Sequence, residues 1–193
     1  MTNLQILSSA DFEAIAPEAP WDFAGFRKLL EAVDGKCAAQ SRDLAGQIAC
    51  KPGCHHCCRR IPTILPVEWA WIRELADGDE GAKESARPEK DSDLRSDLFP
   101  AEPLCGHLDG QGLCTIYEAR PLICRTHGML ILSEEGLDHC PWNFQDLDEV
   151  DEDLVFRLEN IHETLLRLNL SFLQRSYPTK CRELAATRVR FQA

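Results

Sequence analysis

The sequence lacks any long hydrophobic run, since no segment approaches the roughly 20 apolar residues that a helix needs to cross a bilayer. Residues 1–15 also lack the basic start and the uninterrupted apolar stretch of a secretory signal. Basic residues are in deficit: 21 Lys and Arg stand against 32 Asp and Glu, and the net charge of −11 repels nucleic acid and anionic membranes. These absences predict a cytoplasmic protein that binds neither nucleic acid nor membrane.

Common catalytic and nucleotide-binding motifs are missing as well. The sequence has no P-loop, no glycine-rich dinucleotide fingerprint and no signature of a Ser-His-Asp hydrolase. Its apolar fraction of 44% and charged fraction of 27% are ordinary for a folded globular protein. A length of 193 residues suits one compact domain, so we expect a single domain over residues 1–193.

Cysteine is what the sequence has in excess, with ten residues in a chain that shows no export signal. A reducing cytosol keeps thiols free, and free thiols at short spacings are typical of metal or redox sites. The alternative is an exported protein stapled by disulfides. Cys37 and Cys181 stand apart from the other eight, at the edges of predicted helices, and are interpreted as core residues.

The first cysteine group has the spacing Cys-x3-Cys-x2-Cys-Cys and comprises Cys50, Cys54, Cys57 and Cys58. Residues three and four apart share a helix face, so a helix that begins near Cys54 would point three sulfurs the same way. Pro52-Gly53 breaks such a helix and predicts a turn that folds Cys50 back over it. Local geometry alone therefore brings three or four sulfurs together near a helix N-terminus, which lowers the pKa of thiols.

The second cysteine group is spread along the chain and comprises Cys105, Cys114, Cys124 and Cys140. Only the fold can gather these four residues. Arg120-Pro121 predicts the start of a short helix that presents Cys124, and Pro141 after Cys140 resembles the Cys-Pro ends of cluster loops. Eight thiols allow two four-sulfur sites, one metal site plus a redox pair, or one site with spare structural cysteines.

Cationic and imidazole side chains accompany these thiols. Because a four-thiolate site carries excess negative charge, nearby cations can offset that charge and tune a redox potential. Arg120 and Arg125 flank Cys124 and are the preferred candidates for this supporting role beside a cofactor. Five histidines also fall in the cysteine region, where hydrogen-bonding or surface roles are expected more often than direct ligation: His55, His56, His107, His127 and His139.

The parts of the chain on either side of the cysteine region predict helices. Apolar residues recur at three- and four-residue spacing over 21–49 and 154–172, and residues 66–75 read as a helix with Pro66 in its first turn. A short further helix is expected within 179–189. The predicted fold is therefore mainly α, with N-terminal helices over 1–49 and C-terminal helices over 146–193.

Between these helices, residues 50–145 predict a turn-rich, metal-binding centre. Residues 77–100 are rich in Gly, Asp, Glu, Lys and Ser and are interpreted as an exposed insertion. Leu113–Tyr117 predicts a short strand, and residues 129–136 predict one arm and the turn of a small β-hairpin.

The pattern of these cysteines resembles a known family. Cys-x3-Cys-x2-Cys-Cys, followed by Gly112-x-Cys114-x-Ile116-Tyr117-x2-Arg120-Pro121-x2-Cys124-Arg125, is similar to the YkgJ-type cysteine-cluster proteins, which are described as zinc- or iron-chelating domains. The resemblance covers residues 50–143, about half of the chain. It departs from the family at Cys105-Gly106-His107-Leu108, where many members read Cys-Pro-Phe-Leu. The resemblance implies metal-ligand roles for the eight cysteines of the two groups, and no catalytic role.

We therefore predict a metal-binding protein that holds iron, chiefly as an iron–sulfur cluster, or zinc, and acts in metal handling, redox sensing or electron transfer. A second hypothesis is an S-adenosylmethionine-dependent enzyme. Cys50-x3-Cys54-x2-Cys57 matches the spacing in radical enzymes of that class, and the wider family includes flagellin lysine methylases. The sequence shows little of the strand that the barrel of a radical enzyme needs. A third hypothesis is an interaction module that zinc holds in shape.

Overall fold

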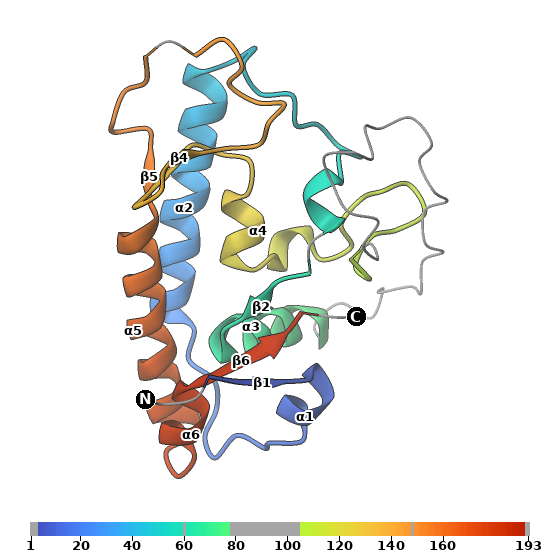
Figure 1. The fold of residues 1–193 in the computed structure, drawn as a ribbon. Coiled ribbons are helices and arrows are strands. Elements are labelled where there is room, and N and C mark those ends of the chain that lie inside the picture. The colour runs from blue at the N-terminus through green and yellow to red at the C-terminus, as the bar shows by residue number, and fades with distance from the viewer. Residues whose placement is uncertain (1–3, 60, 78–104, 148, 192–193) are drawn as a thin grey trace.

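Two long helices form the frame of the molecule. The computed structural model describes residues 4–59, 61–77, 105–147 and 149–191. Helices α2 (Ala24–Asp43) and α5 (Leu158–Ser176) lie side by side (Figure 1). Gly25 permits this approach, because a Cβ at that position would stand 2.7 Å from Leu168 Cδ2. The apolar spacing that predicted helices at both ends of the chain is thus confirmed, although α2 ends before residues 44–49.

Shorter helices complete the helical part. They are α1 (Ser9–Glu13), α3 (Pro66–Asp77), α4 (Leu122–Thr126) and α6 (Cys181–Ala185), together with the 3-10 turns η1 (His56–Arg59) and η2 (Tyr117–Ala119). Helix α3 begins at Pro66 as predicted, since a missing N–H costs nothing in a first turn. Glu68 then reaches back to accept the N–H of Leu65 at 2.9 Å, which caps the helix. Within the described residues, no helix combines the length and apolar character needed to cross a membrane.

Two small sheets connect distant parts of the chain. In the first, β6 (Thr187–Arg190) lies between β1 (Gln5–Leu7), to which it is parallel, and β2 (Thr63–Ile64), to which it is antiparallel. In the second, β3 (Ile131–Ser133) pairs antiparallel with β4 (Gly136–Asp138) and parallel with β5 (Phe156–Arg157). The first sheet fixes the chain directly after the first cysteine group, because β2 follows that group.

The main core is aromatic and lies between α2, α3 and α5. The ring centroid of Phe23 is 5.4 Å from that of Trp71 and 5.8 Å from that of Phe172. Such pairs stabilise a core beyond the area that they bury. A second, smaller cluster is formed by Leu130, Phe144 and Val155.

Gln40 connects helix α2 to the chain around this second cluster. The side chain is fully buried, and its Nε2 donates to Leu130 O at 3.3 Å and to Leu154 O at 2.7 Å. Its Oε1 accepts the N–H of Leu130 at 2.9 Å. One side chain thus satisfies three backbone groups that would otherwise lack partners.

The fold agrees with the prediction in outline and corrects it in detail. The described part is mainly helical, as predicted, and β3 and β4 confirm the hairpin, with its turn at Glu134-Glu135. The strand predicted over Leu113–Tyr117 is wrong: Cys114 makes one isolated bridge with Leu108, and Tyr117 begins η2. From residue 78 onward, the predicted insertion lies outside the described residues.

Candidate metal centre

The first cysteine group lies in a tight turn followed by η1. The N–H of Cys54 donates to Lys51 O at 2.9 Å, and Gly53 has a φ of +87°, which a type II turn requires at its third residue. The N–H of Cys58 then donates to His55 O at 3.0 Å. The turn predicted at Pro52-Gly53 is confirmed, and the helical turn after it is 3-10 in form.

The thiols of this group form two hydrogen-bonded pairs. Cys54 donates to the sulfur of Cys50, and Cys58 donates to the sulfur of Cys57. These hydrogen bonds lower the pKa of Cys50 and of Cys57, because an accepting sulfur is stabilised as a thiolate. They raise the pKa of Cys54 and of Cys58, which hold the shared protons. Each pair therefore releases its first proton more readily than its second.

Backbone N–H groups hydrogen-bond to sulfur at four cysteines from both groups. In each case the donor lies two residues after the cysteine. The pairs are His56 N–H with Cys54, His107 N–H with Cys105, Ile116 N–H with Cys114, and Trp142 N–H with Cys140. A donor aimed at sulfur favours the charged form, and such bonds also tune the potential of a cluster held by thiolates.

The fold brings Cys105 and Cys114 to the first group. The N–H of Cys105 donates to Cys58 O at 2.8 Å. The loop that carries Cys114 packs against the Gly53 turn, since a Cβ at Gly112 would stand 2.7 Å from His55 Nδ1 and 3.3 Å from Gly53 O. Gly112 also has a φ of +75°, so both its conformation and its surroundings require glycine.

Cys124 reaches the centre on helix α4, which begins after Pro121 as predicted. Glu68 fixes the start of this helix, because its Oε1 accepts the N–H of Leu122 at 2.8 Å. Burial raises the pKa of Cys124 to about 12, and the charges of Cys105, Cys57 and Cys114 raise it further. The same carboxylate therefore caps α3 and positions the helix that carries Cys124.

Cys140 lies beside Cys50, and Asn143 holds the two segments together. A Cβ at Gly128 would stand 3.3 Å from Cys140 Cβ and 3.7 Å from Cys50 Sγ. Asn143 is fully buried, and its Nδ2 donates to Gly128 O at 2.8 Å and to Cys50 Sγ at 3.4 Å. Its Oδ1 accepts the N–H of Ala49 at 2.9 Å. The sequence analysis missed Asn143, whose only signal is its place three residues after a cysteine.

The eight sulfurs share one electrostatic neighbourhood. Burial is the main cause of a raised pKa at four cysteines, and negative charge on Cys57 raises the pKa of each of these four further. They are Cys105, Cys114, Cys124 and Cys140. Cys37 lies elsewhere, donating to Arg125 O at 3.5 Å, and burial followed by the charge of Asp34 raises its pKa to about 11. Cys181 packs against the main core.

The two arginines predicted to support the site have different surroundings. The guanidinium of Arg120 lies over the Tyr117 ring, 3.6 Å from its centroid, and its charge favours the thiolate forms of Cys57 and Cys114. The guanidinium of Arg125 is buried, pairs with Asp34 Oδ2 at 2.5 Å and donates to the carbonyls of Arg120 and Glu118. Arg125 therefore ties α4 to α2, while Arg120 faces the thiols.

Histidines surround the centre in contacts of their own. His55 Nδ1 donates to Gly53 O at 2.9 Å, and the ring of His56 stacks on Trp142 at 4.6 Å. His107 stacks on Phe191 at 4.8 Å, and burial lowers its pKa. In the described part of the chain, no three His, Cys, Asp or Glu side chains already surround one point as metal ligands. Coordination therefore requires the cysteine side chains to turn from their thiol partners toward the ion.

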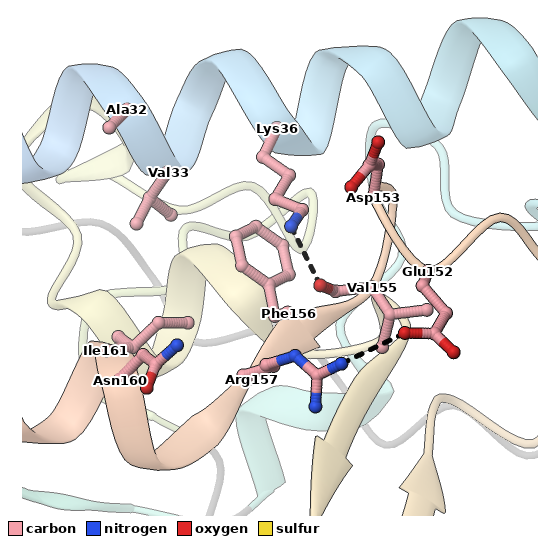
Figure 2. Close-up of a pocket in the computed structure, with 10 residues that line it drawn as sticks. All are labelled: Ala32, Val33, Lys36, Glu152, Asp153, Val155, Phe156, Arg157, Asn160 and Ile161. Atoms are coloured by element: carbon pink, nitrogen blue, oxygen red, sulfur yellow. Dashed lines mark hydrogen bonds and ion pairs between the residues drawn. The ribbon is translucent and has the colours of Figure 1, made fainter.

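One pocket lies away from the cysteines. It has a volume of about 310 Å³ and lies between α2 and the start of α5 (Figure 2). Lys36 Nζ donates to Val155 O at 2.7 Å, and Arg157 Nη2 is 3.1 Å from Glu152 Oε2. Both cations of the pocket therefore already have partners.

Comparison with known proteins identifies one family. The family described as "CxxCxxCC: Putative zinc- or iron-chelating domain" matches residues 49–152, more than half of the chain. The matched range contains all eight cysteines of the two groups, whereas Cys37 and Cys181 lie outside it. No curated protein and no solved structure matches the chain significantly.

Proposed function

Because the chain belongs to the CxxCxxCC family of zinc- or iron-chelating domains, we propose that its eight clustered cysteines bind metal as thiolates and that the metal is iron in an iron–sulfur cluster. The ligands in this proposal are Cys50, Cys54, Cys57, Cys58, Cys105, Cys114, Cys124 and Cys140. A bound cluster supplies one-electron redox chemistry, which suits a role in electron transfer or redox sensing. Zinc is the alternative metal, since it takes the same ligands.

The observation that carries the proposal is the set of backbone N–H groups aimed at sulfur. Thiolates, not thiols, ligate metal, so a binding site must stabilise negative sulfur before or during binding. Four cysteines spread over 54–140 accept an N–H from two residues onward. Arg120 adds a positive charge beside Cys57 and Cys114. None of the ten cysteines, all of which lie in the described residues, is in a disulfide.

The chemistry of the donors favours a cluster over an isolated ion. Hydrogen bonds to sulfur and nearby cations are two of the means by which proteins set the potential of an iron–sulfur cluster. Both surround these cysteines, in a chain where 32 acidic residues outnumber 21 Lys and Arg. Arg120 is the cation that we assign to this role, because its charge acts on Cys57 and Cys114. Both arginines act on Cys37, and Arg125 also ties α4 to Asp34.

Purification without oxygen, followed by metal and sulfide analysis and an absorption spectrum, tests the proposal. An iron–sulfur cluster gives iron, acid-labile sulfide and visible absorption, whereas zinc gives a colourless protein with stoichiometric metal. A variant with both Cys37→Ser and Cys181→Ser is the control and should keep its full metal content. Protein with neither iron nor zinc near stoichiometry would contradict metal binding altogether.

A further inference from the structure

The arrangement of the sulfurs cuts across the two groups seen in the sequence. Cys140, a member of the second group, lies against Cys50 through Gly128 and Asn143. The turn closed by the hydrogen bond from Cys54 N–H to Lys51 O, at 2.9 Å, holds Cys54 close to Cys50. Three cysteines thus meet where the start of the first group approaches the end of the second.

The remaining members of the second group gather around Cys58. The backbone of Cys105 is hydrogen-bonded to Cys58 O, and the N–H of Leu108 donates to Cys105 O at 3.2 Å. Leu108 in turn forms an antiparallel bridge with Cys114, so a short turn holds Cys105 and Cys114 together. Cys105 and Cys124 both pack against the main core, and negative charges at Cys105, Cys57 and Cys114 act on Cys124.

Spacing assigns Cys57, the last of the eight. Cys54-x2-Cys57 is the spacing by which a single turn supplies two thiolates to one metal. The charge of Cys57 also acts on Cys105, Cys114 and Cys124, so Cys57 lies where the two sites meet and its spacing from Cys54 decides the assignment. The hydrogen bond between the thiols of Cys57 and Cys58 places the two ions next to each other.

We infer that the eight cysteines form two four-thiol metal sites: an outer site of Cys50, Cys54, Cys57 and Cys140, and an inner site of Cys58, Cys105, Cys114 and Cys124. This inference rests on the proposed function and adds to it which sulfurs share a metal. Each thiol that ligates gives up its proton to solvent.

The two sites differ in their contact with solvent. Cys50 of the outer site is exposed, whereas Cys105 and Cys124 of the inner site pack against the main core. A chelator therefore reaches the outer metal directly, but reaches the inner metal only when the surrounding structure opens. The outer site is the exchangeable one, and the inner site is part of the folded scaffold.

Anaerobic titration of the reduced apo-protein with Co²⁺ tests this division, since cobalt–thiolate absorption reports each filled site. Wild-type protein should bind two ions. The double variants Cys54→Ser/Cys140→Ser and Cys114→Ser/Cys124→Ser each remove two thiols from one site and should bind one ion. The crossed variant Cys54→Ser/Cys124→Ser removes one thiol from each site and should weaken both. The control Cys37→Ser/Cys181→Ser removes two thiols that belong to neither site and should bind two ions, as the wild type does.

A measurement on the wild type alone covers variants that fail to fold. Protein loaded with Co²⁺ is treated with a chelator for increasing times, and newly freed cysteines are alkylated and mapped by mass spectrometry. The four outer cysteines should become reactive as one set before the four inner ones. Alkylation in any other grouping, or crossed and same-site variants that behave alike, would overturn the two-site division while leaving metal binding intact. Wild-type protein that binds no Co²⁺ would overturn both.

Discussion

Asn143 offers the sharpest test of how the fold positions the cysteines for metal binding. The substitution to make is Asn143→Leu, which keeps the size of the side chain. The substitution removes the hydrogen bonds to Gly128 O and Ala49 N–H and the donor to Cys50 Sγ. A buried backbone group left unpaired costs about 1–3 kcal/mol, and the segment at Ala49 can recover part of its loss from water because Ala49 is exposed. We therefore expect the apo-protein to lose about 2–4 kcal/mol of unfolding free energy.

The metal affinity should fall as well, because Asn143 positions Cys50 beside Cys140. Loss of a residue that orients a ligand typically weakens metal binding by about 10–100-fold. Urea unfolding of the reduced apo-protein measures the first effect, and competition with a chromophoric zinc chelator measures the second. The expected pattern is a weakened outer site beside an unchanged inner site.

Asn169→Leu is the matched control. Asn169 is also buried, at 2% exposure, and its Oδ1 accepts the N–H of Val67 at 3.1 Å in the main core, away from the cysteines. This variant should lose about 1–3 kcal/mol of stability and keep its zinc affinity. The reasoning is refuted if both variants weaken zinc binding by the same factor, or if Asn143→Leu leaves zinc affinity unchanged.

Three further predictions concern the surrounding fold. Gly112→Ala should lower both stability and metal content far more than Gly46→Ala. Both glycines have a positive φ, but of the two only residue 112 has neighbours that an added Cβ would clash with. Equal losses in the two variants would refute this. Gln40→Met should cost about 2–4 kcal/mol in urea unfolding because three backbone hydrogen bonds are lost, and a cost under about 1 kcal/mol would contradict the role given to Gln40. Burial followed by the charge of Asp34 raises the pKa of Cys37 from 9.0 to about 11, so its stabilising effect is complete below pH 9 and is lost as pH rises toward 11. The unfolding free energy of apo Cys37→Ala, measured with urea, should therefore fall less between pH 9 and 11 than that of the wild type. Equal falls in the two proteins would rule this out.

Local signals in the sequence predicted the local structure well. Pro52-Gly53 formed its turn, Pro66 began a helix, and the segment after Pro121 formed α4. Each of these elements depends on the conformations allowed to a few adjacent residues. The strand predicted at Leu113–Tyr117 failed for a reason that composition does not reveal: after the single bridge at Cys114 the chain turns into η2, where Ala119 N–H donates to Ile116 O at 2.9 Å.

The parts that sequence could not give are those that depend on distant contacts. Strands β1 and β6 are three and four residues long, too short for an alternating pattern, and their parallel pairing joins opposite ends of the chain. Asn143 looks like any other asparagine until the fold surrounds it with Gly128 O and Cys50 Sγ. Spacing likewise could not pair Cys140 with Cys50, since only the folded chain brings these residues together.

The position of β6 between β1 and β2 has a consequence for biosynthesis. This strand follows every cysteine in the chain, so a ribosome releases all ten thiols before β6 can join its two neighbours (Figure 1). The growing polypeptide thus presents the proposed metal ligands before β6 has paired with β2, the strand that follows the first cysteine group. Metal delivered during translation would meet an open site, and the arrival of β6 would then close the scaffold behind it.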